Sequence, residues 1–225
     1  GPSAVQGLGA TGGIINYISR TPRKHGTTHT LDAKLSTQGR TDDATIKLGY
    51  LLEHKNDGID AVLYLGGIQR GVGVDGDGRR LGVETTQGDL QDSTGQDIFA
   101  KVGWRFAPDQ RLGASLNQFR ITGNGNWTQV SGNRALGLPT SSQKGGVVLG
   151  ATPRNEVQTA SVEWTHDALF GGATSVQLYK QDFRSLYGAG TFANFQDARL
   201  APSGKLVDQS DIVAHKRGLR ASWVR

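Results

Sequence analysis

The side chains that could do chemistry in this sequence are histidines, serines and acids, and their spacing favours no catalytic site. No histidine lies in an H-E-x-x-H pattern, the helical spacing of zinc hydrolases. No serine lies in a G-x-S-x-G elbow, and the absence of cysteine excludes thiolate ligands and disulfides. We therefore expect no enzyme, no resident metal and no cofactor. The histidines, interpreted as ordinary polar residues near strand ends, are His25, His29, His54, His166 and His215.

Two short stretches resemble ligand-binding loops but lack the surroundings that such loops need. The segment Gly7-Leu8-Gly9-Ala10-Thr11-Gly12 fits the G-x-G-x-x-G pattern, which requires a strand before it and a helix after it. A β-branched stretch ended by Pro22 follows instead, which argues against a nucleotide site. The stretch Asp75-Gly76-Asp77-Gly78 lacks the glutamate of an EF-hand, because Thr86 stands at the twelfth position. We interpret this acidic stretch as a solvated turn.

Alternation of apolar and polar residues is the main structural pattern. It is regular over 31–36, 44–53, 98–106 and 160–164, and weaker over 59–71, 111–123, 173–187 and 211–225. This pattern predicts about eight antiparallel strands with one apolar and one polar face. On the apolar face we expect Ile46, Leu48, Tyr50, Val102, Trp104 and Val162, and on the opposite face Lys47, Lys101, Arg105 and Glu163.

Short and long connections alternate between these strands. Turn-like stretches at 56–58, 107–110 and 166–172 are separated by long polar ones at 72–96, 124–155 and 188–210. Outer-membrane barrels have short periplasmic turns and long external loops. No apolar run reaches the roughly 18 residues of a transmembrane helix. We therefore predict an all-β fold: about eight strands of a larger antiparallel transmembrane β-barrel.

Three tryptophans recur at similar intervals near strand ends. Trp104 and Trp164 come just before short connections, and Trp223 lies near the end of the last predicted strand. Aromatic girdles of barrels lie at the membrane interface, so we predict these residues at the periplasmic ends of their strands. Ordinary core tryptophans are the alternative.

The first twenty residues resemble the closing plug signature of TonB-dependent outer-membrane receptors. That signature runs from Gly-Pro through small residues to Gly-Gly-x-Ile-Asn-x-x-Thr/Ser-Lys/Arg, and here Gln6 stands where many members carry tyrosine. The segment is most similar to the siderophore-receptor branch. The matching residues are Gly1, Pro2, Gly7, Gly12, Gly13, Ile15, Asn16, Ser19 and Arg20.

The resemblance implies a piece of a larger receptor in the bacterial outer membrane. We expect residues 1–22 to end the plug domain, 23–29 to be a linker and 30–225 to begin the barrel. Such receptors bind a scarce solute, often a ferric siderophore, at the outer face. TonB then pulls on the plug, through a region that we expect to precede this piece. Outer-membrane lipid is the remaining partner.

Solute contact is expected in the three long connections. Aromatic rings and guanidinium groups suit bulky, anionic chelates. The candidates are Arg79, Arg80, Trp127, Arg134, Tyr187, Phe192 and Phe195. The competing interpretation is that these side chains only pack the loops against one another.

Two other classes of protein stay open. A small outer-membrane barrel with an adhesin or structural role is one, and a soluble β-rich binding protein, which would need no detergent for extraction, is the other. A nucleic-acid partner is not expected. The net charge is +5, but the Lys and Arg residues are scattered and no RNA-binding aromatic motif accompanies them.

Overall fold

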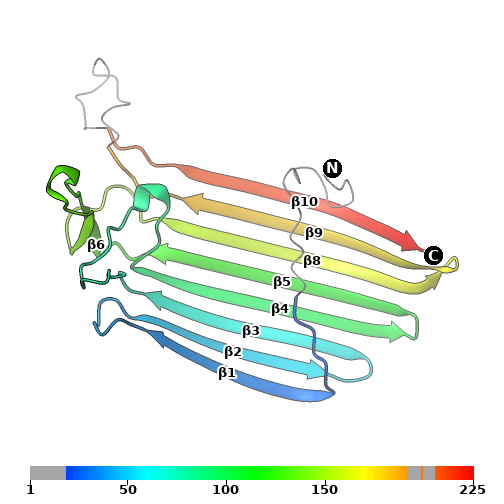
Figure 1. The fold of residues 1–225 in the computed structure, drawn as a ribbon. Helices are drawn as coiled ribbons and strands as arrows, with labels where there is room; N and C mark the ends of the chain where they lie inside the picture. The colour runs from blue at the N-terminus through cyan, green and yellow to red at the C-terminus, as the bar shows by residue number, and fades with distance from the viewer. Residues whose placement is uncertain (1–18, 192–198, 200–205) are drawn as a thin grey trace.

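The protein forms one sheet of eight long antiparallel strands, as predicted, in a computed structural model that describes residues 19–191, 199 and 206–225 (Figure 1). Among these residues, two short strands form a hairpin of their own, and two 3-10 helices lie in the connections. The long strands are β1 (Gly26–Ser36), β2 (Thr45–Lys55), β3 (Ile59–Arg70), β4 (Ser93–Ala107), β5 (Gln110–Gly123), β8 (Arg154–Leu169), β9 (Gly172–Leu186) and β10 (Asp211–Val224). The short elements are β6 (Trp127–Val130), β7 (Ser141–Lys144), η2 (Thr85–Gln87) and η3 (Arg134–Leu136).

Each long strand pairs with the next long strand along the chain, in the order β1-β2-β3-β4-β5-β8-β9-β10. The connections at 56–58, 108–109 and 170–171 are short and lie at one end of the sheet. Those at 71–92 and 124–153 lie at the other end, together with 37–44 and the described parts of 187–210 (Figure 1). The predicted alternation of connections is therefore confirmed. Within the described part of the chain, β1 and β10 are not paired with each other, so the sheet is open.

The register assigns every strand residue to one of two faces, because directly opposed side chains on paired strands share a face. Tyr50 is opposite Leu65, which is opposite Ile98. Val102 and Val162 lie on that same face, both opposite Ala114. The two predicted sets are thus separated: the "apolar face" carries Ile46, Leu48, Tyr50, Val102, Trp104 and Val162, and the "polar face" carries Lys47, Lys101, Arg105 and Glu163.

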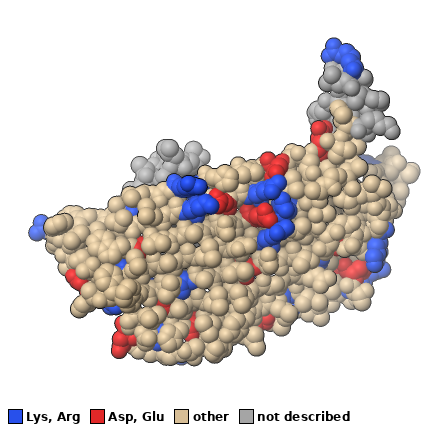
Figure 2. Space-filling view, turned by 180° about the vertical axis from the view of Figure 1, so that it is seen from behind, with Lys and Arg blue, Asp and Glu red and all other residues tan. Residues whose placement is uncertain are grey.

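The apolar face is open to its surroundings. Leu48 is 58% exposed and Leu178 is 57% exposed. Figure 2, the view from behind, shows this face as broad and largely free of charged side chains. A soluble monomer rarely leaves so extended an apolar surface uncovered. One face of the sheet is therefore apolar and uncovered over most of its area.

On the polar face, tyrosine rings lie over glycines of their own or of a neighbouring strand. A Cβ added to Gly66 would lie 2.7 Å from the Tyr64 hydroxyl, and one added to Gly49 would lie 3.1 Å from it. Tyr179 lies over Gly218 in the same way. A glycine in a strand leaves backbone bare, and a neighbouring aromatic ring can cover it. The abundant glycine of this sequence is partly explained by these contacts.

The three regularly spaced tryptophans share the apolar face near the short turns. Trp104 and Trp164 are both opposite Leu112. The indole N–H of Trp223 donates to the Leu169 carbonyl at 3.0 Å. The predicted clustering at one end of the sheet is confirmed, and with Trp104 53% exposed they are not core residues.

Several strands begin earlier than the sequence pattern indicated. β1 starts at Gly26, so residues 26–29, expected in the linker, belong to the sheet. β4 starts at Ser93, inside the expected loop 72–96. The β6–β7 hairpin was not predicted, because four-residue polar strands show little alternation. Among the described residues no helix is long and apolar enough to cross a membrane. The plug-signature residues Gly1, Pro2, Gly7, Gly12, Gly13, Ile15 and Asn16 lie outside the described residues.

Candidate functional site

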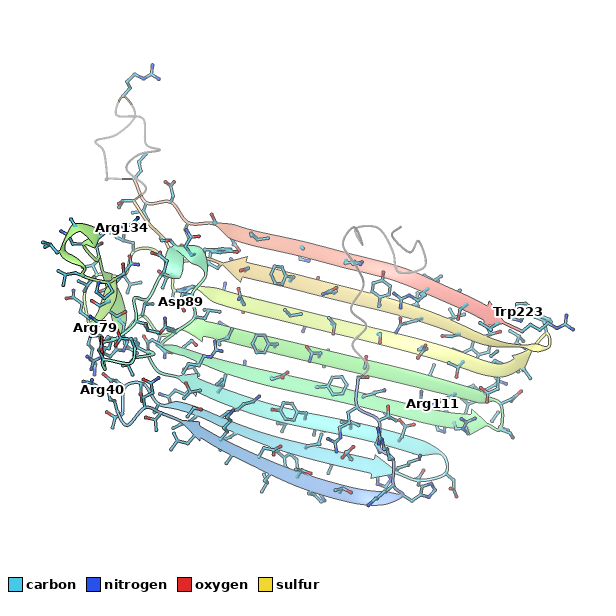
Figure 3. The ribbon with its side chains drawn as sticks, viewed as in Figure 1. Arg40, Arg79, Asp89, Arg111, Arg134 and Trp223 are labelled. Carbon is cyan, nitrogen blue, oxygen red and sulfur yellow. The ribbon has the colours of Figure 1, made fainter. Side chains whose placement is uncertain are left out.

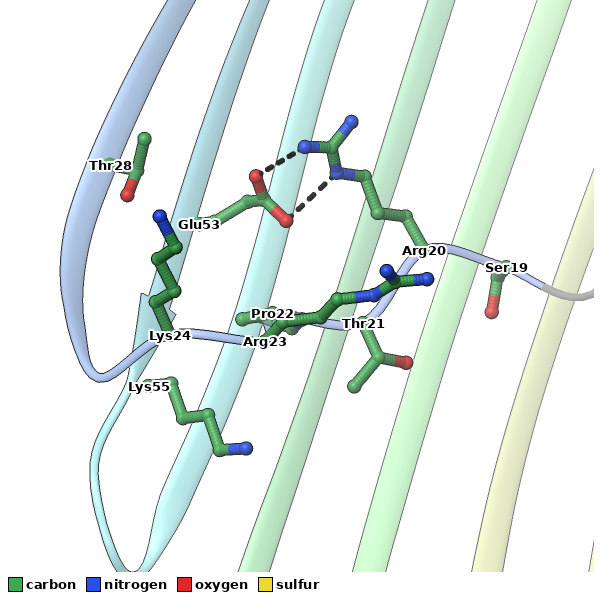
Figure 4. A pocket seen from close by; sticks show the side chains of 9 residues that line it. All are labelled: Ser19, Arg20, Thr21, Pro22, Arg23, Lys24, Thr28, Glu53 and Lys55. Atoms are coloured by element: carbon green, nitrogen blue, oxygen red, sulfur yellow. Dashed lines mark hydrogen bonds and ion pairs between the residues drawn. The ribbon is translucent and has the colours of Figure 1, made fainter.

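The segment before β1 lies across the polar face and is held there by charge. Arg20 donates from Nε and Nη2 to the two carboxylate oxygens of Glu53 on β2, each at 2.8 Å (Figure 4). The Glu53 side chain is only 12% exposed. The hydrogen bonds to Glu53, with its negative charge, raise the pKa of the Arg20 guanidinium above its ordinary value. A planar two-point contact of this kind fixes orientation as well as distance.

A second contact holds the segment farther across the sheet. Lys101 on β4 donates from Nζ to Thr21 Oγ1 at 3.0 Å and to Ser19 Oγ at 3.1 Å. Beneath the segment, Leu51 and Val62 are buried. A hollow of about 1040 Å³ lies beside it, lined by Ser19, Arg20, Thr21, Pro22, Arg23, Lys24, Thr28, Glu53 and Lys55 (Figure 4). The chain entering the sheet is thus anchored to the middle of the polar face.

A second hollow, of about 790 Å³, opens among the long connections. It brings together the 37–44 connection, the 71–92 connection and the β6–β7 hairpin. Three cationic side chains, one carboxylate and one indole ring face it. The lining residues are Gly39, Arg40, Thr41, Asp42, Arg80, Trp127, Ser142, Gln143 and Lys144. We call this the loop hollow.

Arg80 is the central side chain of the loop hollow. Its Nε donates to Asp42 Oδ2 at 2.7 Å, and its guanidinium carbon lies 4.8 Å from the centre of the Trp127 ring. The hydrogen bond from Arg80 holds the pKa of the Asp42 carboxyl below its ordinary value. A cation over an indole face adds a further attraction of about 0.5–1 kcal/mol at exposed sites. Three separate connections therefore meet at one guanidinium.

Hydrogen bonds between connections hold the β6–β7 hairpin, which carries Trp127 and Lys144, in place. Asp92, which adopts a φ of 46°, accepts from the Asn126 backbone N–H at 2.8 Å and from Asn124 Nδ2 at 3.1 Å. Ser142 Oγ accepts from the Val83 N–H at 2.8 Å. Asp92 is buried, so these bonds satisfy a carboxylate that would otherwise be costly to desolvate. They hold the hairpin against the 71–92 connection.

Of the seven predicted solute-contact residues, the structure brings together Arg80 and Trp127. Arg79 is bound within its own turn, by Asp75 at 2.9 Å and Asp77 at 2.8 Å. Arg134 lies in η3 at the far tip of the hairpin (Figure 3). The ring of Tyr187 packs against Gly88, in the 71–92 connection. Phe192 and Phe195 lie outside the described residues.

Sequence reasoning missed Arg40, Asp42 and Lys144 as residues of the loop hollow. The predicted contacts come only from the three long connections, and the connection 37–44 is shorter than these. Its signal is the run Gly39-Arg40-Thr41-Asp42-Asp43, a dense set of charges between two alternating segments. Lys144 gave no signal, because only the β6–β7 pairing carries it to the hollow.

The other candidate sites do not gain support. The Asp75 and Asp77 carboxylates are occupied by Arg79, and hydrogen bonds from Arg79 hold the pKa of Asp75 below its ordinary value. This fits the predicted turn better than a calcium loop. His25 and His29 are four residues apart, but His29 bonds Tyr50 at 2.8 Å and His25 lies 3.7 Å from Asp57. No group of three metal-ligating side chains occurs in the described part of the chain.

The chemistry available in the loop hollow is recognition rather than bond-making. Arg40, Arg80 and Lys144 supply positive charge, and Trp127 supplies a flat apolar surface. The single carboxylate of Asp42 is already bound by Arg80. Such a combination suits an anionic solute with planar groups. No family model matches the sequence, and no solved structure matches the chain.

Proposed function

We propose that this chain belongs to a TonB-dependent receptor of the bacterial outer membrane that takes up a scarce solute, with a ferric siderophore as the favoured class. The observation that carries the proposal is the pair of dissimilar sheet faces. One face is apolar and uncovered, and the other is polar and crossed by the segment that begins with the last residues of the plug-like signature, Ser19 and Arg20. A lipid-facing wall with a plug on its inner side has this arrangement.

The arrangement of connections supports a direction for the receptor. Tryptophans lie on the apolar face beside the short turns, as aromatic girdles do at a membrane interface. The long connections at the opposite end would face the outside. The loop hollow lies among them, where an arriving solute would first meet the protein. The contacts of Arg20 and Lys101 would hold the end of the plug against the barrel wall.

The open edges of the sheet support a barrel larger than eight strands. Unpaired edges expose backbone donors and acceptors, which lipid cannot satisfy. Strands beyond β1 and β10 would satisfy them in the complete receptor. We therefore propose that this segment does not form a stable closed barrel alone, and that residues 1–225 purified alone aggregate.

Localisation and energy-dependent uptake test the proposal directly. The full-length protein should be extracted from the outer membrane only with detergent. Cells that express it should accumulate ferric siderophore, and this should stop when an uncoupler dissipates the proton gradient or when TonB is deleted. Extraction without detergent would contradict the proposal, and so would accumulation that does not depend on the proton gradient.

The loop hollow makes a separate prediction about solute contact. Arg40→Ala and Trp127→Ala should each weaken binding of an anionic ferric chelate by about tenfold, since each removes a contact worth roughly 1–2 kcal/mol. Arg134→Ala, at the tip of the same hairpin, removes a cation outside the hollow and should change binding far less. Surface expression of each variant is the control. Equal affinity of all three variants and the parent would place solute contact elsewhere.

A further inference from the structure

The apolar face changes character part-way along β5, β8, β9 and β10. Towards the short turns these strands present no Lys, Arg, Asp or Glu on this face. Towards the long connections they present a mixed charged patch, visible in Figure 2 on an otherwise largely uncharged surface. We call it the charged patch; it consists of Arg120, Arg154, Glu156, Lys180, Asp182, Arg184, Asp211, His215 and Arg217.

The charged patch is confined to one half of the sheet. Arg154 on β8 belongs to a row of directly opposed residues that crosses the whole sheet. On β1, β2 and β3 the residues of that row are Leu35, Ile46 and Gln69, and none of them is charged. If polar residues were needed wherever the apolar part of this face ends, charged residues would occur at that level on all the strands. Because the charge is local, it indicates a local partner.

Most charges in the patch are neutralised within it. Arg120 lies 3.1 Å from Glu156, Arg184 lies 2.7 Å from Asp211, and His215 lies 2.8 Å from Asp182. These pairs form a hydrogen-bonded surface rather than free charge, and they line a hollow of about 450 Å³. Arg120 and Arg154 share the single carboxylate of Glu156, so one positive charge is left over there. A second positive charge is left over at the patch boundary.

Lys180 and Arg217 form that boundary. They are directly opposite each other on β9 and β10, and like charges so placed repel. Asp182 partners Lys180, whereas no ion pair or hydrogen bond of the Arg217 side chain occurs within the described residues. Leu178 and Leu219 lie two positions closer to the short turns, on the same face, and are 57% and 65% exposed. Two cations thus adjoin two uncovered leucines.

We infer that Lys180 and Arg217 bind the phosphate of an outer-leaflet lipid headgroup whose acyl chains cover Leu178 and Leu219. An anion between the two cations turns their repulsion into two attractive contacts, and guanidinium binds phosphate through two parallel hydrogen bonds. A phospho-lipid presents its phosphate immediately above its acyl chains, which is the order of charges and leucines on this face. This inference rests on the proposed outer-membrane location.

A second copy of the chain is the competing occupant. A stable protein contact needs about 800 Å² per partner with a complementary surface. A copy using this face would have to match both the mixed charges and the leucines. A lipid needs only one phosphate and one acyl chain. We therefore favour the lipid, and the test includes the alternative.

The test measures lipid binding by the full-length protein in detergent. The probe is bisphosphorylated lipid A, with its dephosphorylated form and inorganic phosphate as separate arms. Lys180→Gln and Arg217→Gln should each weaken lipid A binding about fivefold, and the double variant about twentyfold or more, at roughly 1 kcal/mol per cation. Arg220→Gln is the matched control, because Arg220 lies three residues further along β10 and faces the opposite side. It should bind as the parent does.

The outcomes separate this inference from the proposed function. Weak binding of the dephosphorylated lipid and of inorganic phosphate supports a site that needs both phosphate and acyl chain. Equal binding by the double variant and the parent, in protein that is folded and inserted in the outer membrane, overturns the inference and leaves the proposed function standing. A dimer that dissociates in Arg217→Gln identifies a second copy as the occupant and also overturns it. A protein that is not found in the outer membrane overturns both.

Discussion

The Arg20 guanidinium and the Glu53 carboxylate, 33 positions apart in the sequence, meet through two hydrogen bonds of 2.8 Å across the polar face. Glu53 is largely shielded, whereas 62% of the Arg20 side chain is exposed. Solvent therefore screens the pair, and its contribution to stability is modest. Its main effect is positional: it determines where the chain lies as it approaches β1.

Removing the charge of Glu53 should release the segment 19–25. In Glu53→Gln the carboxylate is lost, so we expect trypsin to cleave after Arg20, Arg23 and Lys24 about two to five times faster, in line with a screened ion pair. Limited proteolysis followed by mass spectrometry measures the rate. Glu163→Gln removes a carboxylate from the same face on β8, and trypsin should cleave this variant at the parental rate. Faster cleavage in both variants would indicate general loosening of the sheet.

Leu48 and Lys47 are neighbours on β2 that face opposite sides. If the apolar face contacts lipid, Leu48→Arg places a charge in the hydrocarbon at about 2–4 kcal/mol near the midplane. We expect Leu48→Arg to reduce the yield of folded, heat-modifiable protein in the outer membrane severalfold. Lys47→Ala, on the polar face, should leave the yield unchanged. Equal yields from both variants would mean that this face does not contact lipid.

Gly66 and Gly67 are adjacent on β3 and differ in what a side chain would meet. A Cβ on Gly66 would displace the Tyr64 ring, whereas one on Gly67 would have no atom within 4 Å. We expect Gly66→Ala to destabilise the protein by about 1–3 kcal/mol through overpacking. Gly67→Ala should be neutral or slightly stabilising, because it reduces the freedom of the unfolded chain. Urea unfolding in detergent compares the two, and a larger loss in Gly67→Ala would contradict the proposed contact.

The contact between Asp42 and Arg80 should depend on pH. The pKa of Asp42 is lower in the folded protein than in the unfolded chain, because Arg80 donates to the carboxylate. Its stabilisation is therefore complete above the unfolded pKa of about 3.9 and is lost as the pH falls through the folded value. Trp127 reports the change, since it lies beside Arg80. In protein with Trp104, Trp164 and Trp223 replaced by Phe, acid below about pH 4 should alter Trp127 fluorescence.

Asp42→Asn supplies the control for this titration. In this variant Arg80 has no charged partner at position 42. The fluorescence of Trp127 near neutral pH should therefore already resemble that of the acid form of the parent. It should then change little on acidification. An unchanged titration in Asp42→Asn would assign the transition to another group, such as Asp43, whose pKa is lowered chiefly by a hydrogen bond from Thr37.

Local pattern was sufficient for the strands and their two faces. A strand side chain alternates between faces with a period of two, so the order of Leu48 and Lys47 already places them on opposite sides. The same rule placed Val102 with Trp104 and separated Lys101 from both. Connection lengths then predicted which ends of the strands lie together, because antiparallel neighbours joined by short turns must reverse direction.

Tertiary structure alone decided which loop side chains meet. Arg79 and Arg80 are identical in type and adjacent, yet Arg79 is held by its own turn and Arg80 reaches Asp42 and Trp127, 38 positions before it and 47 after it. Arg40 and Lys144 reach the same hollow from two different connections, and no repeating pattern in the sequence relates their positions. Such contacts depend on the path of irregular backbone between strands, which no repeating side-chain pattern encodes. Residue type therefore indicated which side chains could bind a solute, and only the packing of the connections determined which ones gather around one space.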